Sequence, residues 1–325
     1  MTSLHALASA LRDSVGLRHK QDIAPVVEAL GLRNAAIRVG DDCAAIPDGP
    51  PAEGRGWLLL AMEGFLPGFV AREPFFAGYC GIMVNLSDIA AMGGRPVAVV
   101  DAIWSRDGEH AAPILEGLRA AAGIYGVPIV GGHTNSRDGG EQLAVAVLGR
   151  AGALLTSFDA RPGELLLAAI DLRGRYHEPF AWWDASSDCM DPARLRADLE
   201  LLPQIAEAGL SRAAKDISMG GLIGTAIMLA ECSGIGLSIT PSLVPRPPGA
   251  DLARWLTAFP SFGFLLTCTP GDADALTALF AARDIACAVI GACEAGSQVA
   301  LAEAGAREVV HDLSAAPLIG CGAGA

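Results

Sequence analysis

Long apolar runs are absent from this sequence of 325 residues. No uncharged apolar run approaches the roughly 18 to 20 residues needed to cross a bilayer. The first residues also lack the basic region, apolar core and cleavage site of a secretory signal. With 52% hydrophobic and 18% charged residues, the chain has enough apolar material for sizeable cores. We therefore expect a folded, soluble, cytoplasmic protein, with two domains as the prior from its length.

Positive charge is scarce, and the formal net charge is -13. A field of this sign repels phosphate polymers and anionic lipid, which argues against a nucleic-acid or membrane partner. A local basic site for a small phosphate remains compatible with it. The expected partner is a small-molecule substrate.

Paired cysteine motifs are also missing. None of the eight cysteines belongs to a CxxC pair, so neither a structural zinc site nor a disulfide framework is indicated. Cys321 lies close to the end of the sequence, within CGAGA.

Lysine is almost absent, since Lys20 and Lys215 are the only two. If arginine has replaced lysine wherever either serves, the two that remain mark places that need a compact ammonium group. Lys20 lies in an HKQD junction expected to be a loop, where a solvated surface lysine is the alternative. Lys215 directly precedes Asp216.

The common nucleotide-binding motifs are absent as well. The sequence contains no GxxxxGK[ST] and no GxGxxG after a strand. Any phosphate site must therefore be built from other elements.

The clearest feature present is a predicted helix of about five turns over residues 75–92. Pro74 suits the first helical position, and Gly93-Gly94 supplies a stop. Asn85 and Asp88 are three residues apart and share a face of this apolar helix. A carboxylate in such a run is costly unless it is paired, which a metal ion could do; a hydrogen-bonded or capping aspartate is the alternative.

Further acids lie at the ends of predicted elements. Asp41 and Asp42 follow Gly40 at the end of a short extended run, and Glu63 lies at the end of a buried strand over 57–65. Asp216 follows another short run. Each is ambiguous alone, because GDD triplets are often turns and a glutamate at a strand end is often exposed.

Two glycine pairs are candidates for binding phosphate. Gly131 and Gly132 are predicted to form a turn whose N-H groups, with His133 and Thr134, line an anion-binding concavity. The second pair is Gly220 and Gly221, which are predicted to begin an apolar helix together with Ser218. The positive end of this helix favours phosphate. Helix capping and close packing are the alternatives.

Convergence of these acids would require a cation. Two carboxylates 4 Å apart repel by about 4 kcal/mol at an effective dielectric constant near 20. Oxygen ligands without a cysteine or histidine cluster indicate Mg²⁺, which completes its shell with water and substrate phosphates. The predicted cofactors are therefore ATP and Mg²⁺.

Domain boundaries are expected near residues 152–163, which gives an N-terminal domain over 1–155 and a C-terminal α+β domain over 156–325. One amphipathic helix is predicted over 193–209. Trp182 and Trp183 fall in an irregular insert, where they either cover a substrate or seal a core edge.

The order of the motifs GDD, NLSDIAAMGGRP, GVPIVGGHT and KDISMGGL resembles the aminoimidazole ribonucleotide (AIR) synthetase superfamily. That superfamily includes thiamine-monophosphate kinase, selenophosphate synthetase and a hydrogenase-maturation dehydratase, and the resemblance spans about residues 22–291. It implies a two-domain AIR synthase-like α+β fold, an N-terminal mixed sheet that pairs across a homodimer, and an ATP-magnesium cleft. By this resemblance Asn85 is a nucleotide-site residue, Asp41, Asp42 and Asp88 are metal ligands, and Asp216 is a metal or phosphate-site acid. Glu63 can also bind the metal, although it reaches further than the aspartate usual there, so the predicted metal site comprises Asp41, Asp42, Glu63, Asp88 and Asp216.

The sequence departs from the superfamily pattern at Glu63, which stands where an aspartate is usual. It also departs from the thiamine-monophosphate kinase motifs GGDT and DVSDGL, where His133 replaces the first acid and Met219 the second. The resemblance also implies that Lys20 could take the part of the N-terminal lysine of selenophosphate synthetase. Lys20, His133 and Asp216 are the predicted catalytic residues.

The predicted function is ATP- and magnesium-dependent activation of an amide, carboxylate or phosphate oxygen, of the synthetase type. A small-molecule kinase and a non-catalytic nucleotide-binding dimer that acts as a partner protein are the alternatives. A reactive terminal cysteine like that of the dehydratase is a further parallel, for Cys321.

Overall fold

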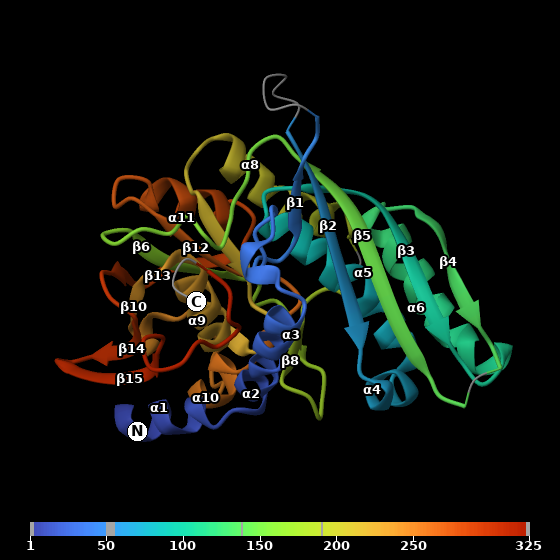
Figure 1. Ribbon diagram of the computed structural model, residues 1–325, viewed down its shortest axis with the longest axis horizontal. Coiled ribbons are helices and arrows are strands. Elements are labelled where there is room, and N and C mark those ends of the chain that lie inside the picture. The colour runs from blue at the N-terminus through green and yellow to red at the C-terminus, as the bar shows by residue number, and fades with distance from the viewer. Residues whose placement is uncertain (1–2, 50–55, 138, 190, 323–325) are drawn as a thin grey trace. The chain divides into compact units, whose positions relative to one another are not determined.

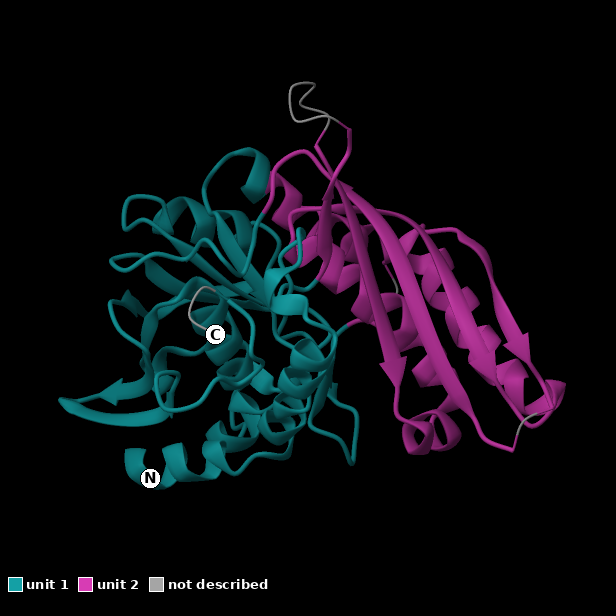
Figure 2. Ribbon diagram, in the orientation of Figure 1, with its two compact units in different colours: residues 1–42, 155–185, 205–325 teal, residues 43–154, 186–204 magenta. Residues whose placement is uncertain are grey.

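The computed structural model describes residues 3–49, 56–137, 139–189 and 191–322. These residues form two compact units, shown in different colours in Figure 2. Unit 1 comprises residues 1–42, 155–185 and 205–325, and unit 2 comprises residues 43–154 and 186–204. Within the described parts of the chain, no helix is long and apolar enough to span a membrane.

Unit 2 is built on a five-stranded sheet with the order β1-β2-β5-β3-β4. All neighbouring strands are antiparallel except β3 and β4, which are parallel and are connected through helix α6. The strands are β1 (Ala44–Pro47), β2 (Trp57–Phe65), β3 (Arg95–Trp104), β4 (Ile129–Asn135) and β5 (Gln142–Ala151).

Helices cover one face of this sheet, as Figure 1 shows. Helix α5 contacts β2, β3 and β5, and α6 packs against α5. Glycines allow the two helices to approach closely, because a Cβ atom on Gly117 would lie 1.9 Å from the carbonyl oxygen of Phe75. The helices of this unit are α4 (Pro67–Arg72), α5 (Pro74–Ala91), α6 (Gly108–Tyr125) and α7 (Pro192–Leu199).

The side chains of the sheet alternate between its two faces, as strand geometry requires. On β2, Leu59 and Ala61 are buried, whereas Leu60 and Met62 are 47% and 69% exposed. One face therefore forms the core with α5, and the other presents apolar side chains outward.

Unit 1 contains a seven-stranded sheet with the order β15-β14-β10-β13-β6-β12-β9 and a small sheet with the order β11-β8-β7. The larger sheet is antiparallel except between β10 and β14. Its strands are β6 (Leu165–Ile170), β9 (Ala213–Asp216), β10 (Gly236–Ile239), β12 (Gly263–Cys268), β13 (Ala286–Glu294), β14 (Gln298–Glu303) and β15 (Ala306–Asp312). The small sheet consists of β7 (Arg175–Tyr176), β8 (Trp182–Asp184) and β11 (Phe259–Pro260).

Helix α9 (Gly221–Ser233) lies in the core of unit 1, where every residue from its start to Cys232 is buried. The first helices of the chain also belong to this unit, since α1 packs on β14 and β15 and α2 packs on α9. The remaining helices are α1 (Leu4–Arg12), α2 (Val15–Gln21), α3 (Ile23–Ala29), α10 (Leu252–Leu256), α11 (Ala273–Ala281), and the 3-10 turns η1 (Leu32–Asn34) and η3 (Pro241–Leu243). Helix α8 (Leu201–Glu207) contains the change of unit at residue 204.

The predicted α+β class is confirmed, because helices and mixed sheets are present in both units. The chain changes unit between Leu154 and Leu155, close to the expected boundary. Residues 1–42 nevertheless belong to unit 1, and residues 186–204 belong to unit 2.

The insert that contains the two tryptophans is anchored by Trp183, which is 7% exposed and donates a hydrogen bond to the carbonyl of Asp171. Trp183 therefore seals a core edge, and Trp182 stacks on Phe180 with ring centroids 4.0 Å apart.

Candidate functional site

The Gly40-Asp41-Asp42 turn is fixed in unit 1 by the loop that begins at residue 155. Gly40 has φ of +120°, a conformation that side-chain-bearing residues rarely adopt. Both carboxylate oxygens of Asp41 are engaged by Ser157: the hydroxyl donates to Oδ1 at 2.7 Å and the backbone N-H donates to Oδ2 at 2.9 Å. Burial raises the pKa of Asp41 to about 6, although Lys215 and Ser157 act in the opposite direction.

Lys215 neutralises this acidic turn from the buried strand β9. Its ammonium Nζ lies 2.5 Å from Oδ1 of Asp42, and both side chains are only 5% exposed. It also contacts Ser157 Oγ at 3.4 Å and the carbonyl of Gly40 at 3.5 Å. Burial alone would lower the pKa of Lys215, but the carboxylates of Asp42 and Asp41 outweigh it and raise that pKa. The lysine is therefore held charged between two acids.

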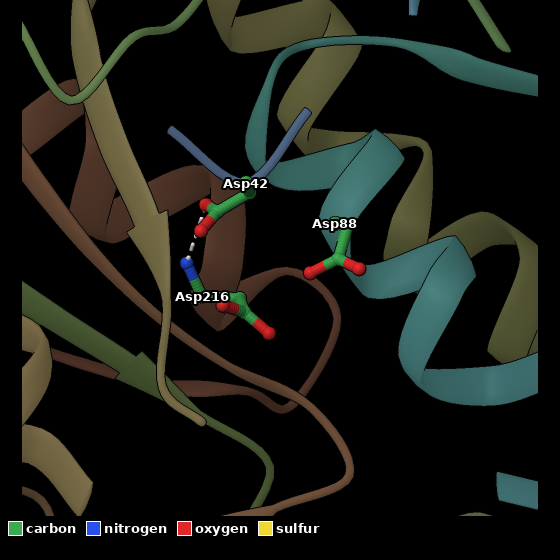
Figure 3. Close-up of side chains that lie close together, drawn as sticks. All are labelled: Asp42, Asp88 and Asp216. Atoms are coloured by element: carbon green, nitrogen blue, oxygen red, sulfur yellow. Dashed lines mark hydrogen bonds between the residues drawn. The ribbon is translucent and has the colours of Figure 1, made fainter. Parts of the chain in front are cut away.

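Asp216, the next residue on β9, brings a further carboxylate to the same place. Its backbone N-H donates to Oδ2 of Asp42 at 3.2 Å, and its carbonyl accepts a hydrogen bond from Thr225. One oxygen of each of the Asp42 and Asp216 carboxylates lies within 4.8 Å of the other (Figure 3). This spacing suits two oxygen ligands of one cation.

The start of α9 follows Asp216 within five residues. Gly220 is its N-cap and supplies no side-chain capping bond. Gly221 has φ of +65°, and a Cβ atom there would lie 2.5 Å from the carbonyl oxygen of Leu256. Glycine is thus required at position 221 for both conformation and space.

Lys20 lies beside this glycine turn. A Cβ atom on Gly220 would be 3.5 Å from Cγ of Lys20, and one on Gly16 would be 2.0 Å from the carbonyl oxygen of Met219. The close approach of α2 to residues 219 and 220 therefore brings Lys20 to the start of α9. The expectation of a loop here was wrong, because Lys20 belongs to α2, which Ser14 caps with its side chain.

Asn85 and Asp88 lie in unit 2 on α5, at 0% and 6% exposure. The amide nitrogen of Asn85 donates to the carbonyl of Gly81 at 2.8 Å. Its Oδ1 is buried and has no hydrogen-bond partner among the residues that the structure describes. Such an acceptor is costly unless a ligand group donates to it. Asp88, labelled in Figure 3, projects from the same helix.

The other predicted residues of unit 2 lie on the sheet. Glu63 is on β2 opposite Val145, with the same parity as the core residue Ala61.

The expected turn at Gly131-Gly132 was wrong, because β4 continues through it to Asn135, paired with β3. Space explains one glycine: a Cβ atom on Gly132 would lie 2.8 Å from Oδ1 of Asp101. His133 and Thr134 are exposed on this edge strand.

Two features of the site were missed in the sequence. Ser157 lies in the TSFD loop, which had signalled only a domain boundary. Lys215 was marked by the scarcity of lysine, but nothing in the sequence indicated that it pairs with Asp42.

Comparison with known proteins extends these observations. Residues 40–151 match the N-terminal domain of AIR synthase related proteins, and residues 165–302 match the C-terminal domain. An uncharacterized protein of Synechocystis is 42% identical over 317 residues, which cover 95% of this chain and 96% of that protein. Phosphoribosylformylglycinamidine synthase subunit PurL of Cereibacter sphaeroides is 29% identical over 90% of this chain, which spans 40% of the length of PurL.

Two solved structures share the fold. Thermotoga maritima PurL complexed with ATP has a TM-score of 0.68 at 19% identity, covering 89% of this chain and 46% of that one. AaThiL complexed with AMPPCP and TMP has a TM-score of 0.66 at 19% identity, covering 85% and 91%. With both of its domain models matched in order along the sequence, this chain belongs to the AIR synthase related protein family.

Proposed function

We propose that this protein is an ATP- and Mg²⁺-dependent enzyme that phosphorylates an amide, carboxylate or phosphate oxygen of a small substrate. The observation that carries the proposal is the pair of carboxylates on Asp42 and Asp216, held within 4.8 Å beside the buried Lys215. Two acids so close repel each other, and a divalent cation offsets that repulsion. The same arrangement can hold the metal of a metal-nucleotide complex.

The donor set fits Mg²⁺, which prefers carboxylate oxygens and retains sites for water and phosphate. Asp42 and Asp216 are the proposed ligands in unit 1, and Asp88 and Glu63 are those proposed in unit 2. Asp41, whose two carboxylate oxygens already accept hydrogen bonds from Ser157, is proposed as a further ligand. When bound, the metal would neutralise charge on the transferred phosphoryl group.

Residues near the start of α9 are proposed to receive phosphate. The N-H groups at the start of this 13-residue helix carry the positive end of its dipole, and the Lys20 side chain lies against Gly220. Lys20 is proposed to orient the transferred group, together with Ser218. Asn85 is proposed to bind the nucleotide, because its buried Oδ1 would then gain a donor.

A further part of the nucleotide site is proposed at Gly131, Gly132, His133 and Thr134. These residues lie in an exposed edge strand, so the backbone groups of the strand, rather than those of a turn, would contact the nucleotide.

A homodimer is proposed from the outward face of the unit 2 sheet. Leu60, Met62, Val100 and Leu148 are between 39% and 69% exposed on β2, β3 and β5. A second copy of this sheet would cover such a face with a surface of the same apolar character.

The synthetase type is favoured over the alternatives by sequence similarity to PurL, which is named as an amidine synthase. The kinase alternative has support from the shared fold of AaThiL, whose complex contains AMPPCP and TMP. The third alternative is a nucleotide-binding dimer without turnover.

The test is ADP formation by the purified protein with ATP and Mg²⁺ against a panel of amides, carboxylates and phosphate esters. We expect substrate-dependent ADP release, abolished by Asp216→Asn. An amide substrate supports the synthetase type, and a phosphorylated product identifies a kinase. Tight Mg²⁺-dependent ATP binding with no turnover on any substrate would favour the partner protein.

A further inference from the structure

The segment Leu318–Cys321, here called the closing segment, is held by hydrogen bonds to one side chain of α9. Its backbone N-H groups at positions 318, 319 and 320 all donate to the carboxylate of Glu231, at 2.9, 2.9 and 2.8 Å. Leu318, Ile319 and Cys321 are at most 3% exposed. The segment is therefore part of the interior of unit 1.

Glu231 is itself only 7% exposed. A buried carboxylate is costly unless its oxygens accept hydrogen bonds, and three N-H donors meet that need. Oε2 accepts two of the bonds and Oε1 accepts the third. This mutual dependence fixes the closing segment on α9.

The closing segment ends against the turn that carries the acids. A Cβ atom on Gly40 would lie 2.6 Å from Cβ of Cys321 and 2.9 Å from Sγ of Cys232. The thiol of Cys232 donates to the carbonyl of Gly40 at 3.4 Å. Cys321 and Cys232 thus pack directly on the backbone that precedes Asp41 and Asp42.

This packing connects Glu231 to the proposed metal site within one compact unit. The Asp42 side chain is placed by Lys215, by the N-H of Asp216 and by the path of its own backbone. We propose that Glu231 is a positioning residue, which sets the affinity of the Gly40–Asp42 turn for a divalent cation by docking the closing segment beneath it. The inference rests on the proposed function, since it presumes that Asp42 binds the cation.

Reactive chemistry at Cys321 is disfavoured by the same packing. Burial raises the pKa of its thiol, so that less thiolate is present at neutral pH. A structural contact accounts better for this cysteine than a nucleophilic role parallel to that of the dehydratase.

The test compares the full-length wild type with Glu231→Gln, using Mn²⁺ as the probe cation. Because both carboxylate oxygens accept bonds, either orientation of the glutamine amide places its NH2 group against a backbone N-H. Glu28→Gln, on the exposed side of α3, is the matched control. Mn²⁺ affinity is measured by electron paramagnetic resonance, and docking of the closing segment by the rate at which Cys321 is alkylated, read by mass spectrometry.

We expect Glu231→Gln to accelerate alkylation of Cys321 and to weaken Mn²⁺ binding by about 10- to 100-fold, the range typical of lost outer-shell support. Glu28→Gln should match the wild type, and Glu231→Asp, which keeps the carboxylate, should recover part of the affinity. If Glu231→Gln does not fold, Cys321→Gly tests the same expectation for Mn²⁺, because it removes the Cβ atom that packs against Gly40.

Faster alkylation with unchanged Mn²⁺ affinity would overturn the inference. So would unchanged alkylation in Glu231→Gln, because the carboxylate would then not hold the segment. A wild type that binds no Mn²⁺ would instead contradict the proposed function and remove the basis of the inference, while the alkylation rates would still report whether Glu231 docks the segment.

Discussion

Lys215 is the residue on which the acidic turn of unit 1 depends. It is the one cation that contacts Asp42 in the described structure, and it lies between that carboxylate and the Asp41–Ser157 pair. Breaking a buried ion pair leaves an uncompensated charge, which costs far more than loss of a surface pair. The lysine therefore serves stability even where no cation is bound.

Lys215→Met should lower the stability of unit 1 by about 3–5 kcal/mol, because Asp41 and Asp42 would remain buried without their counter-charge. The measurement is a urea titration of both proteins in the absence of divalent cations. Lys215→Met combined with Asp42→Asn should recover part of the loss, since one of the stranded charges is removed. Equal urea midpoints for wild type and Lys215→Met would contradict the structural role.

At the residue scale, the acids of the site are more evident from the sequence than the residues that pair with them. Asp42 and Asp216 stood out because carboxylates adjoined glycines and apolar runs. Ser157 could not be found, since a serine in a polar loop carries no signal and its bonds to Asp41 join residues 116 positions apart. Which of two neighbouring aspartates is engaged by hydrogen bonds is likewise set by tertiary structure.

At the scale of elements, the close contact of α5 and α6 positions Asn85 and Asp88 in unit 2. Gly78 and Gly117 make this contact possible, because a Cβ atom on either would lie within 2.1 Å of a carbonyl oxygen of the other helix. The backbones therefore approach more closely than side chains would permit.

Gly117→Ala should destabilise unit 2 by about 1–3 kcal/mol, because the added methyl group forces the helices apart. Gly123→Ala on the same helix is the control. Nothing lies within 4 Å of its Cβ position, so this substitution should stabilise by about 0.5–1 kcal/mol through helix propensity. Thermal unfolding of the two variants should move in opposite directions, and a shift of the same sign in both would contradict the packing argument.

Elements with local signals were predictable from the sequence. Pro74 and Gly93-Gly94 delimit α5, and a strand was predicted where β2 lies. The expectation that this strand is buried was wrong, because Leu60 and Met62 on its outward face are exposed. The single helix expected over 193–209 is divided into α7 and α8, because Pro203 lacks the N-H group that would continue the first helix. A strand was expected before Gly131-Gly132, but the turn expected at these glycines was wrong, since pairing with β3 continues through them and outweighs their local preference.

At the scale of the whole molecule, each of the two units is built from segments that are not contiguous in the sequence. Residues 1–42 pack with unit 1, although they precede the strands of unit 2 in sequence. A linear reading of the chain cannot foresee this, because segments distant in sequence meet only in the folded protein. The sequence also gives little indication of the outward apolar face of the unit 2 sheet. Side chains that alternate along a strand show that the sheet has two faces, but they do not show what covers each face.

The proposed dimer predicts that Leu60→Asp combined with Met62→Asp yields a monomer in sedimentation velocity, because charges would be buried in an apolar interface. Leu115→Asp is the control, since Leu115 is 46% exposed on helix α6 rather than on the sheet. The control should sediment like the wild type. A monomeric wild type, or a sheet variant that still dimerises, would contradict this interface.

The central claim is that Asp42 and Asp216 form part of a magnesium-nucleotide site, and calorimetry of ATP binding with and without Mg²⁺ tests it most directly. We predict Mg²⁺-dependent ATP binding by the wild type and by the control variant Asp284→Asn. Asp284 is an exposed turn residue with φ of 55°, a conformation that asparagine also adopts. In Asp216→Asn, affinity should fall by more than the roughly 10- to 100-fold typical of losing an outer-shell partner of a metal. ATP binding that is independent of Mg²⁺ in the wild type, or equally tight in Asp216→Asn, would contradict the account.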